Sequence, residues 1–325
     1  MLEELVGKGL IIHHWDTDGI CSATLLLNHL KQPIANTTPS IGAFYLSHEE
    51  IKKAQQYDYV IVVDMALPEN NIKSIAEKTR VIIFDHHHQN PIEQVEHINP
   101  VAFGNNSKDY PSCTWVLKKT LELPLTLYVI LGIIGDREQK ILQDYRFKSI
   151  IDKYAEKKQL SFEILIELCQ LLDSNYKVGD KNGVEEAPFL LRKYESHKEI
   201  LSNHDWIEKK YMYEAKLEEV LREPPFEENG ILVKWLNTEY SIISSVTRKI
   251  AWGTGKDTIV VNKGFFPQHD QVYCRSRVKD MKPLISKVKE YGYNAGGKTD
   301  VLGAVVPKNK TEKLISVLKN YLLKK

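Results

Sequence analysis

Short apolar runs that end in aspartate or histidine constrain the fold of this chain more than any other feature. The run at residues 81–84 leads directly into Asp85, His86 and His87, and earlier runs end in the same way. Runs of this kind, alternating with helical stretches, are typical of buried strands in a parallel, doubly wound sheet. In open α/β sheets the ligand crevice lies beyond the carboxyl ends of the strands. The sequence therefore predicts that the polar residues at these ends converge on one site.

The converging side chains are carboxylates and imidazoles, which is the chemistry of a metal site. They are His14, Asp16, Asp18, Asp64, Asp85, His86, His87 and Asp136. Hard carboxylates mixed with a few imidazoles suit manganese or magnesium better than a structural zinc ion. Crowded carboxylates repel one another without cations, and two cations roughly 3.5–4 Å apart form the clamp that hydrolyses phosphate esters. We therefore expect a phosphoesterase with two divalent metal ions, with manganese favoured and magnesium also compatible.

These residues form four motifs, at positions 14–19, 64, 85–87 and 136. In their order and spacing, the four motifs resemble those of the DHH phosphoesterase superfamily. That superfamily includes RecJ-type exonucleases, enzymes of the nano-RNase type that degrade small oligonucleotides, and manganese-dependent inorganic pyrophosphatases. A second signature, at residues 294–298 and followed by Gly303, stands where the DHH-associated C-terminal domain carries its Gly-Gly-His substrate loop. The resemblance therefore covers nearly the whole chain.

The resemblance implies a role for each residue of the metal site. His14 and Asp16 are expected to bind one ion, Asp18, His86 and Asp136 the other, and Asp64 both. The catalytic residues implied are His87, which would face the scissile phosphate, and Asp85, which would orient an imidazole. Ser112 is expected to cap a helix rather than touch phosphate. The sequence predicts no role for Asp173 and Asn175.

The resemblance also implies a substrate-binding site in the C-terminal part of the chain. The expected residues are Arg275, Ser276, Gly296, Gly297 and Lys298. Arg275 and Ser276 would end a strand, and backbone amides of the glycine loop would bind a phosphate or a terminal nucleotide. Lys298 departs from the family, where histidine is usual. Lysine keeps a positive charge but lacks the planar donor and acceptor geometry of imidazole.

The predicted organisation is α/β in two domains. A doubly wound DHH domain is expected at residues 1–190, a helical connector at 191–222, and a smaller α/β substrate-binding domain at 223–325. Residues 1–222 carry 26 Lys and Arg against 33 Asp and Glu, whereas residues 223–325 carry 18 against 10. The basic C-terminal part could hold a polyanion against the metals, although many of its lysines could simply solvate the last helix.

No apolar run approaches the length of a membrane span, and the four cysteines are scattered without metal-binding spacing. Together with the absence of a signal peptide pattern, this predicts a cytoplasmic protein. The expected function is that of a compact, archaeal-type RecJ-like exonuclease. It would release mononucleotides from single-stranded DNA or RNA, working with a helicase or a replication or repair factor.

The sequence leaves two alternative functions open and disfavours two others. A nano-RNase-like hydrolase of oligonucleotides or dinucleotides and a nucleoside bisphosphate phosphatase use the same chemistry. A catalytically silent scaffold is disfavoured because the ligands of all four motifs are present. A pyrophosphatase is also disfavoured, because that branch places a histidine four residues before the first aspartate, where this chain has Ile12.

Overall fold

The computed structural model describes residues 2–30 and 32–324, which divide into two compact units. The N-terminal unit runs to Tyr176 and resumes over Asp180–Lys210. The C-terminal unit comprises Lys177–Gly179 and the chain from Tyr211 onward. The boundary between them thus falls within the long helix α11 (His204–Arg222).

A five-stranded parallel sheet forms the centre of the N-terminal unit and confirms the predicted fold class. Its strands are β1 (Gly9–His13), β2 (Ile34–Thr37), β3 (Tyr59–Val63), β4 (Arg80–Phe84) and β5 (Glu96–Ile98), in the order β2-β1-β3-β4-β5. Strands β1 and β3 are buried throughout, as their apolar sequences require. The strand order reverses between β1 and β3, and such a switch point is where doubly wound sheets bind ligands.

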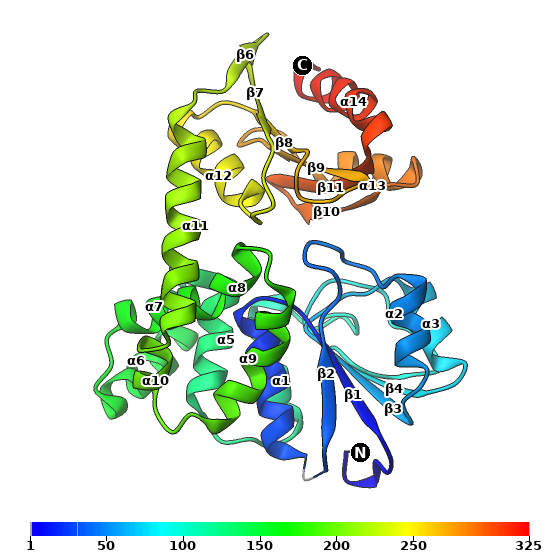
Figure 1. Ribbon diagram of the computed structural model, residues 1–325, viewed down its shortest axis with the longest axis vertical. Helices are drawn as coiled ribbons and strands as arrows, with labels where there is room; N and C mark the ends of the chain where they lie inside the picture. Colours follow the sequence, from blue (N-terminus) through cyan, green and yellow to red (C-terminus); the bar gives the residue numbers. More distant parts are fainter. Residues whose placement is uncertain (1, 31, 325) are drawn as a thin grey trace. The chain divides into compact units, whose positions relative to one another are not determined.

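Helices cover both faces of this sheet. The helices of this unit are α1 (Thr17–His29), α2 (His48–Ala54), α3 (Glu69–Ala76), α4 (Cys113–Thr120), α5 (Leu127–Arg137), α6 (Tyr145–Lys158), α7 (Phe162–Leu172), α8 (Ser174–Lys177), α9 (Lys181–Lys193), α10 (His197–Leu201) and the start of α11, with short 3-10 turns η1 (Leu2–Glu4), η2 (Ser107–Asp109) and η3 (Glu138–Gln143). In Figure 1, α1, α5 and α9 lie on one side of the sheet and α2 and α3 on the other. Among the described residues, no helix is both long and apolar enough to cross a membrane.

The C-terminal unit is built on a six-stranded mixed sheet. Its elements are β6 (Phe226–Glu228), β7 (Ile231–Leu236), α12 (Ile243–Thr254), β8 (Thr258–Asn262), β9 (His269–Arg275), α13 (Lys282–Glu290), β10 (Asn294–Lys298), β11 (Val301–Pro307), η4 (Lys308–Lys310) and α14 (Thr311–Leu323). The strand order is β10-β11-β9-β8-β7-β6, and β7 and β8 form its parallel pair. Alternate residues of β7 enter different cores: Val233 packs with α13 and α14, and Leu232 packs with α12.

One expectation for this unit is wrong. The glycine signature was predicted to be a loop, but residues Asn294–Lys298 form the edge strand β10, paired antiparallel with β11. The pairing explains why two of the glycines are needed. Gly297 has a φ of +147°, and a side chain there would lie 2.0 Å from the carbonyl oxygen of Val301. A side chain at Gly303 would meet the ring of Tyr273 at 2.9 Å.

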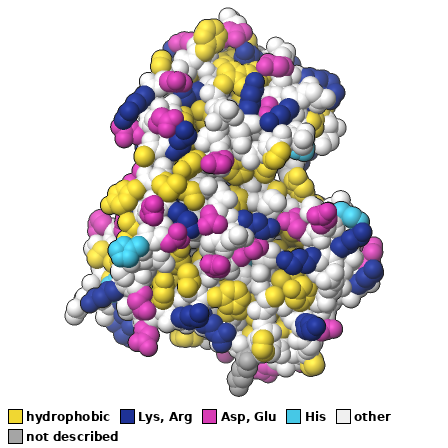
Figure 2. All heavy atoms as spheres, viewed as in Figure 1, with side chains coloured by type: hydrophobic (Ala, Val, Ile, Leu, Met, Phe, Trp, Pro, Cys, Tyr) yellow, Lys and Arg dark blue, Asp and Glu magenta, His cyan; other side chains and the backbone are white. Residues whose placement is uncertain are grey.

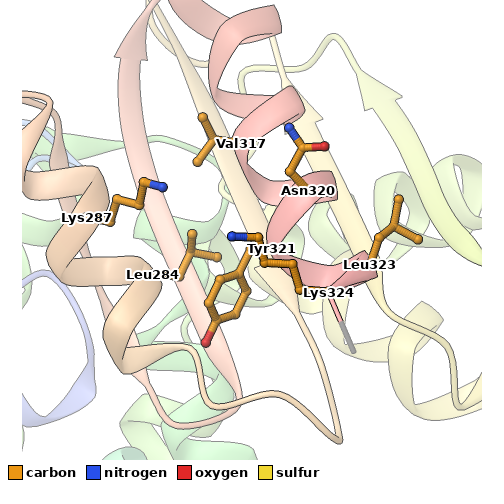
Figure 3. A pocket seen from close by; sticks show the side chains of 7 residues that line it. All are labelled: Leu284, Lys287, Val317, Asn320, Tyr321, Leu323 and Lys324. Atoms are coloured by element: carbon orange, nitrogen blue, oxygen red, sulfur yellow. The ribbon is translucent and has the colours of Figure 1, made fainter.

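The surface of the molecule mixes both signs of charge. Figure 2 shows Lys and Arg side chains interspersed with Asp and Glu on the visible face of each unit. A pocket of about 450 Å³ lies between α13 and α14, with Leu284 and Lys287 on one side and Val317 and Tyr321 on the other (Figure 3). None of the predicted substrate-binding residues lines this pocket.

Candidate metal centre

The register of the parallel sheet brings the first polar residues after four strands to one level. His13, the last residue of β1, aligns with the last residues of β3, β4 and β5 in turn. The next residues along the chain are His14, Asp64, Asp85 and Asn99. The first three of these donate their backbone N–H groups to the last residue of the neighbouring strand, at 3.0 to 3.3 Å. The sheet itself therefore sets the spacing of these side chains.

A first cluster of metal-binding groups consists of His14, Asp16 and Asp64, whose donor atoms lie within 4.8 Å of one another. His14 Nδ1 lies 2.8 Å from Asp16 Oδ2 and 3.9 Å from Asp64 Oδ2. Asp16 also caps α1 by accepting the N–H of Gly19 at 3.1 Å. A side chain at Gly19 would lie 2.2 Å from the carbonyl oxygen of His14, so this tight turn requires glycine.

A second cluster consists of Asp64, His86 and His87. His86 Nε2 lies 3.3 Å from Asp64 Oδ1 and 3.8 Å from Asp18 Oδ2. His86 Nδ1 lies 3.2 Å from the carbonyl oxygen of Tyr110, a contact that leaves Nε2 as the ligand atom. The two oxygens of Asp64 thus face different clusters. Its backbone φ of +59° is unusual for a residue other than glycine, so this carboxylate is held in a strained position.

The donor set fits divalent cations. The buried atoms Asp64 Oδ1 and His86 Nε2 have no hydrogen-bond partner among the described residues. Burial, together with the carboxylates of Asp18 and Asp16, raises the pKa of Asp64 well above its usual value. A buried carboxylate in this setting needs positive charge to ionise, and mixed oxygen and imidazole donors suit manganese or magnesium. The two clusters are therefore candidate metal sites that share Asp64.

Asp18 and Asp136 lie beside these clusters rather than within them. The carboxylate of Asp18 accepts the backbone N–H groups of Cys113 at 2.6 Å and Thr114 at 3.1 Å, at the start of α4. A side chain at Gly132 of α5 would lie 2.4 Å from Asp18, so this glycine lets α5 pass close to the site. Burial raises the pKa of Asp18, and the nearby carboxylate of Asp136, four residues beyond Gly132, adds to the shift.

Asp85 belongs to neither cluster but contacts His87 of the second one. Its Oδ1 lies 2.7 Å from His87 Nδ1, and its Oδ2 accepts hydrogen bonds from Gln89 at 2.9 Å and Asn99 at 3.5 Å. Burial opposes a charge on His87, but Asp85, supported by Asp136 and Asp16, raises the pKa of this imidazole to about 9. The arrangement is the one expected of a carboxylate that orients an imidazole.

In the C-terminal unit, the register of the sheet places Arg275 and Lys298 at the same end. Arg275 aligns with Val301 of β11, which in turn aligns with Lys298 of β10. Arg275 is 8% exposed, and its Nη1 lies 2.5 Å from Asp300 Oδ2. Lys298 is exposed. The two predicted cationic residues therefore occupy one row, one of them buried and paired and the other open to solvent.

The other predicted substrate-binding residues at this end differ in accessibility. The hydroxyl oxygen of Ser276 is used within its own turn, where it accepts the N–H groups of Val278 at 3.2 Å and Lys279 at 2.9 Å. Gly296 is exposed, and no atom lies within 4 Å of the position that a side chain would occupy. The open backbone at Gly296 can therefore be approached closely by a ligand.

A comparison with known protein families identifies the N-terminal domain of this chain. The profile of the DHH family, N-terminal domain, matches residues 8–170, which hold every predicted metal ligand. The chain belongs to the DHH family. It is accordingly a DHH-family metal-dependent phosphoesterase. No curated protein matches the chain significantly.

Solved structures with a similar fold include RecJ proteins and a phosphodiesterase. The exonuclease RecJ bound to manganese is 15% identical with a TM-score of 0.69, and the match covers 100% of this chain and 93% of RecJ. RecJ from Thermus thermophilus with Mn²⁺ is 16% identical with a TM-score of 0.68, covering 99% of this chain and 53% of that protein. A pGpG-specific phosphodiesterase from Vibrio cholerae is 14% identical with a TM-score of 0.52, covering 97% and 98%.

The structure gives Asp173 a position in the N-terminal unit that the sequence did not reveal. Asp173 Oδ1 accepts the backbone N–H of Thr17 at 2.9 Å and its hydroxyl at 2.6 Å. Thr17 is fully buried and lies between the predicted ligands Asp16 and Asp18. Asp173 therefore fixes the turn of the first DHH motif through two hydrogen bonds to Thr17. The signal was present in the sequence, since Asp173 directly follows an apolar run, as the predicted ligands do.

Two other polar residues of the DHH domain have structural contacts. Ser112 accepts the N–H of Trp115 at 3.1 Å and so caps α4, which confirms the capping prediction. Asn175 accepts a hydrogen bond from Lys209 Nζ at 2.9 Å and donates one to the carbonyl oxygen of Gly183. Asn175 thus joins helices α8, α9 and α11.

Proposed function

We propose that this DHH-family phosphoesterase is a single-strand-specific exonuclease that releases mononucleotides from DNA or RNA. The observation that carries the proposal is the position of Asp64, whose two oxygens face two separate clusters of metal-binding groups. The fold similarity to a RecJ exonuclease over the whole chain supports it. So does the excess of Lys and Arg over Asp and Glu in residues 223–325, since a long polyanion binds through many phosphate contacts.

The residues of the centre are assigned to two divalent cations, with manganese favoured. His14 and Asp16 would hold one, His86, Asp18 and Asp136 the other, and Asp64 would belong to both. When bound, the ions lower the pKa of a water molecule and offset the negative charge of the phosphate. The hydrogen bonds that Asp18 accepts from α4 would fix its carboxylate for this role.

His87 would stabilise the charge that develops on the phosphate oxygens. The carboxylate of Asp85, which raises the pKa of this imidazole, favours its protonated form. Because Asp85 occupies Nδ1, Nε2 is the ring atom that can donate a hydrogen bond to the substrate. A donor that is held in place before the reaction stabilises the transition state without reorganising during it. Asp85 would thus act by fixing the direction of His87.

The C-terminal unit would bind the strand. Lys298 and the open backbone at Gly296 are accessible to a phosphate, and Arg275 and Ser276 shape the same end of the sheet. A strand held at several phosphates supplies binding energy remote from the scissile bond. The catalytic efficiency, kcat/KM, should therefore depend on the length of the substrate.

The decisive experiment is a time course of digestion with matched DNA and RNA oligonucleotides, each labelled at one end or the other. It should be run with manganese, with magnesium and with chelator. We expect mononucleotides from one end of a long single strand, and no reaction after chelation. Internal cuts, or full activity in chelator, would contradict the proposal.

A second candidate function is the hydrolysis of dinucleotides or very short oligonucleotides. The similarity to a pGpG-specific phosphodiesterase favours it, although the TM-score is lower than that for RecJ. The two candidates differ in their dependence on length. An exonuclease should lose efficiency steeply on a dinucleotide, whereas a dinucleotide hydrolase should prefer it. Competition between a long strand and a dinucleotide in one reaction separates them.

A further inference from the structure

A group of arginines surrounds one exposed tryptophan in the C-terminal unit. Trp252 lies in the last turn of α12 and is 41% exposed. The guanidinium carbon of Arg277 lies 4.8 Å from the centre of its ring, and that of Arg275 lies 6.0 Å away. Arg248 precedes Trp252 by four residues on the same helix, and residues at this spacing share a helix face. Three cationic side chains thus flank one aromatic surface.

The ion pair that Arg275 makes with Asp300 does not use every donor of the Arg275 guanidinium. Burial lowers the pKa of Arg275, and although Asp300 opposes this effect, Arg248 lowers the pKa further. Arg275 is 92% buried, since its exposed fraction is 8%, and its Nε has no hydrogen-bond partner among the described residues. A buried guanidinium with an unused donor favours the approach of an anion.

Aromatic rings between cationic side chains are the typical means of binding single strands. Bases stack on the ring in a manner that tolerates any sequence, while the cations contact the phosphates. We propose that Trp252 stacks on one base of a bound single strand, with Arg277 contacting the phosphate beside it. This inference rests on the proposed action on single-stranded nucleic acid and adds a base-binding position to it.

The same unit contains a matched control for this position. Trp235 is 39% exposed, and Lys263 Nζ lies 4.1 Å from the centre of its ring. Lys263 directly follows β8, whereas Arg275 aligns with Thr258, the first residue of β8. The two tryptophans are therefore similar in exposure and in having a cation over the ring, but their cations lie at opposite ends of one strand.

The test measures binding of a long, labelled single strand to the full chain by fluorescence anisotropy, in chelator so that the strand is not consumed. Trp252→Ala should weaken binding by about 5- to 150-fold, the range for loss of one stacked base. Trp252→Phe should retain most of the affinity because it keeps an aromatic ring. Trp235→Ala should bind like the wild type. Equal affinity of Trp252→Ala and the wild type would overturn the inference.

A strand that lacks bases distinguishes stacking from a merely structural role. The wild type should bind the abasic strand more weakly than the normal strand, and Trp252→Ala should discriminate less between the two. If the melting curve showed that Trp252→Ala is unfolded, the binding of the normal and the abasic strand by the wild type and by Trp252→Phe would still test the stacking position. Equal binding of both strands by the wild type overturns the stacking position alone. Failure of the wild type to bind any single strand overturns the proposed substrate class as well.

Discussion

The candidate metal centre and the end of the C-terminal sheet that carries Arg275 and Lys298 both lie where strands end, but they are constructed differently. In the metal centre, Asp64 is 2% exposed and Asp85 is completely buried, and backbone register sets their spacing. At the C-terminal sheet end, Lys298 and Trp252 are exposed. The candidate metal centre is therefore made of buried carboxylates that need positive charge to ionise, whereas the C-terminal position consists of side chains that are exposed to solvent.

This difference predicts which measured quantity each site controls. Carboxylates fixed by buried hydrogen bonds stabilise a geometry that matters in the transition state, so changes there should lower kcat and metal affinity. Exposed cations and an exposed ring contribute binding that is similar in the ground state and the transition state. Changes there should raise KM and alter the dependence on salt, while leaving kcat nearly constant.

The largest effect is expected from Asp64→Asn. Because both clusters share this carboxylate, its loss should lower turnover by more than the ~10–100-fold typical of outer partners of a metal site. Bound manganese should fall as well, as measured by titration calorimetry. Asp152→Asn is the control, because Asp152 forms an exposed surface pair with Lys148. Near-normal turnover and metal content in Asp64→Asn would mean that the shared-ligand assignment is wrong.

The same variant tests whether the buried carboxyl group of Asp64 makes the stability of the metal-free protein depend on pH. The pKa of Asp64 is raised by burial, so the folded protein keeps a proton on this group at pH values where the unfolded chain has lost it. Stability of the metal-free wild type should therefore fall as pH rises through that window and recover as pH falls. Asp64→Asn lacks this titrating group. The amount by which its free energy of unfolding exceeds that of the metal-free wild type should therefore shrink as the pH falls. Denaturant unfolding in chelator measures the difference, and an advantage that is independent of pH would contradict this account.

The metal centre was largely predictable from the sequence because it follows from strand ends. Apolar runs identified β1, β3 and β4, and the parallel register then placed His14, Asp64 and Asp85 together. Two features could not be found in this way. The strands β2 and β5 are short and only partly buried, so their apolar pattern is weak. The contact of Asp173 with Thr17 joins residues 156 positions apart, and only the packing of α7 against α1 reveals it.

An intermediate effect is expected from Asp173→Ala. Removing the carboxylate leaves the buried N–H of Thr17 without its acceptor, and leaves its hydroxyl only the carbonyl oxygen of Cys169 at 3.0 Å, which should loosen the turn that carries Asp16 and Asp18. We expect manganese affinity to fall by about 10–100-fold, as for other residues that orient ligands. Asp173→Asn keeps an oxygen that can accept both hydrogen bonds, so it should restore most of the affinity. Equal loss in both variants would indicate that the charge, rather than the hydrogen bonds, matters.

The C-terminal position was less predictable, for a physical reason. Glycines indicate close backbone approach, but they do not distinguish a loop from an edge strand, and residues 294–298 proved to be strand β10. The signature nevertheless lies at the same end of the sheet as Arg275, since Lys298 shares a row with that residue. The neighbourhood of Trp252 depends on how α12 packs beside β9, which no local pattern in the sequence indicates.

The smallest effect is expected from Lys298→Ala. Lys298 is exposed, so removing it should leave the fold and the manganese affinity unchanged while raising KM a few-fold. If its ammonium contacts one phosphate of a single strand, the slope of log affinity against log salt should decrease by about 0.7. Lys319→Ala is the control, because Glu228 already neutralises that lysine at 2.6 Å. A lower kcat at saturating substrate would place Lys298 in the catalytic step and would contradict the assignment of kcat to the metal centre and of KM to the C-terminal position. An unchanged salt slope would instead remove Lys298 from the substrate path and leave the arginines around Trp252 as the main contacts to the strand.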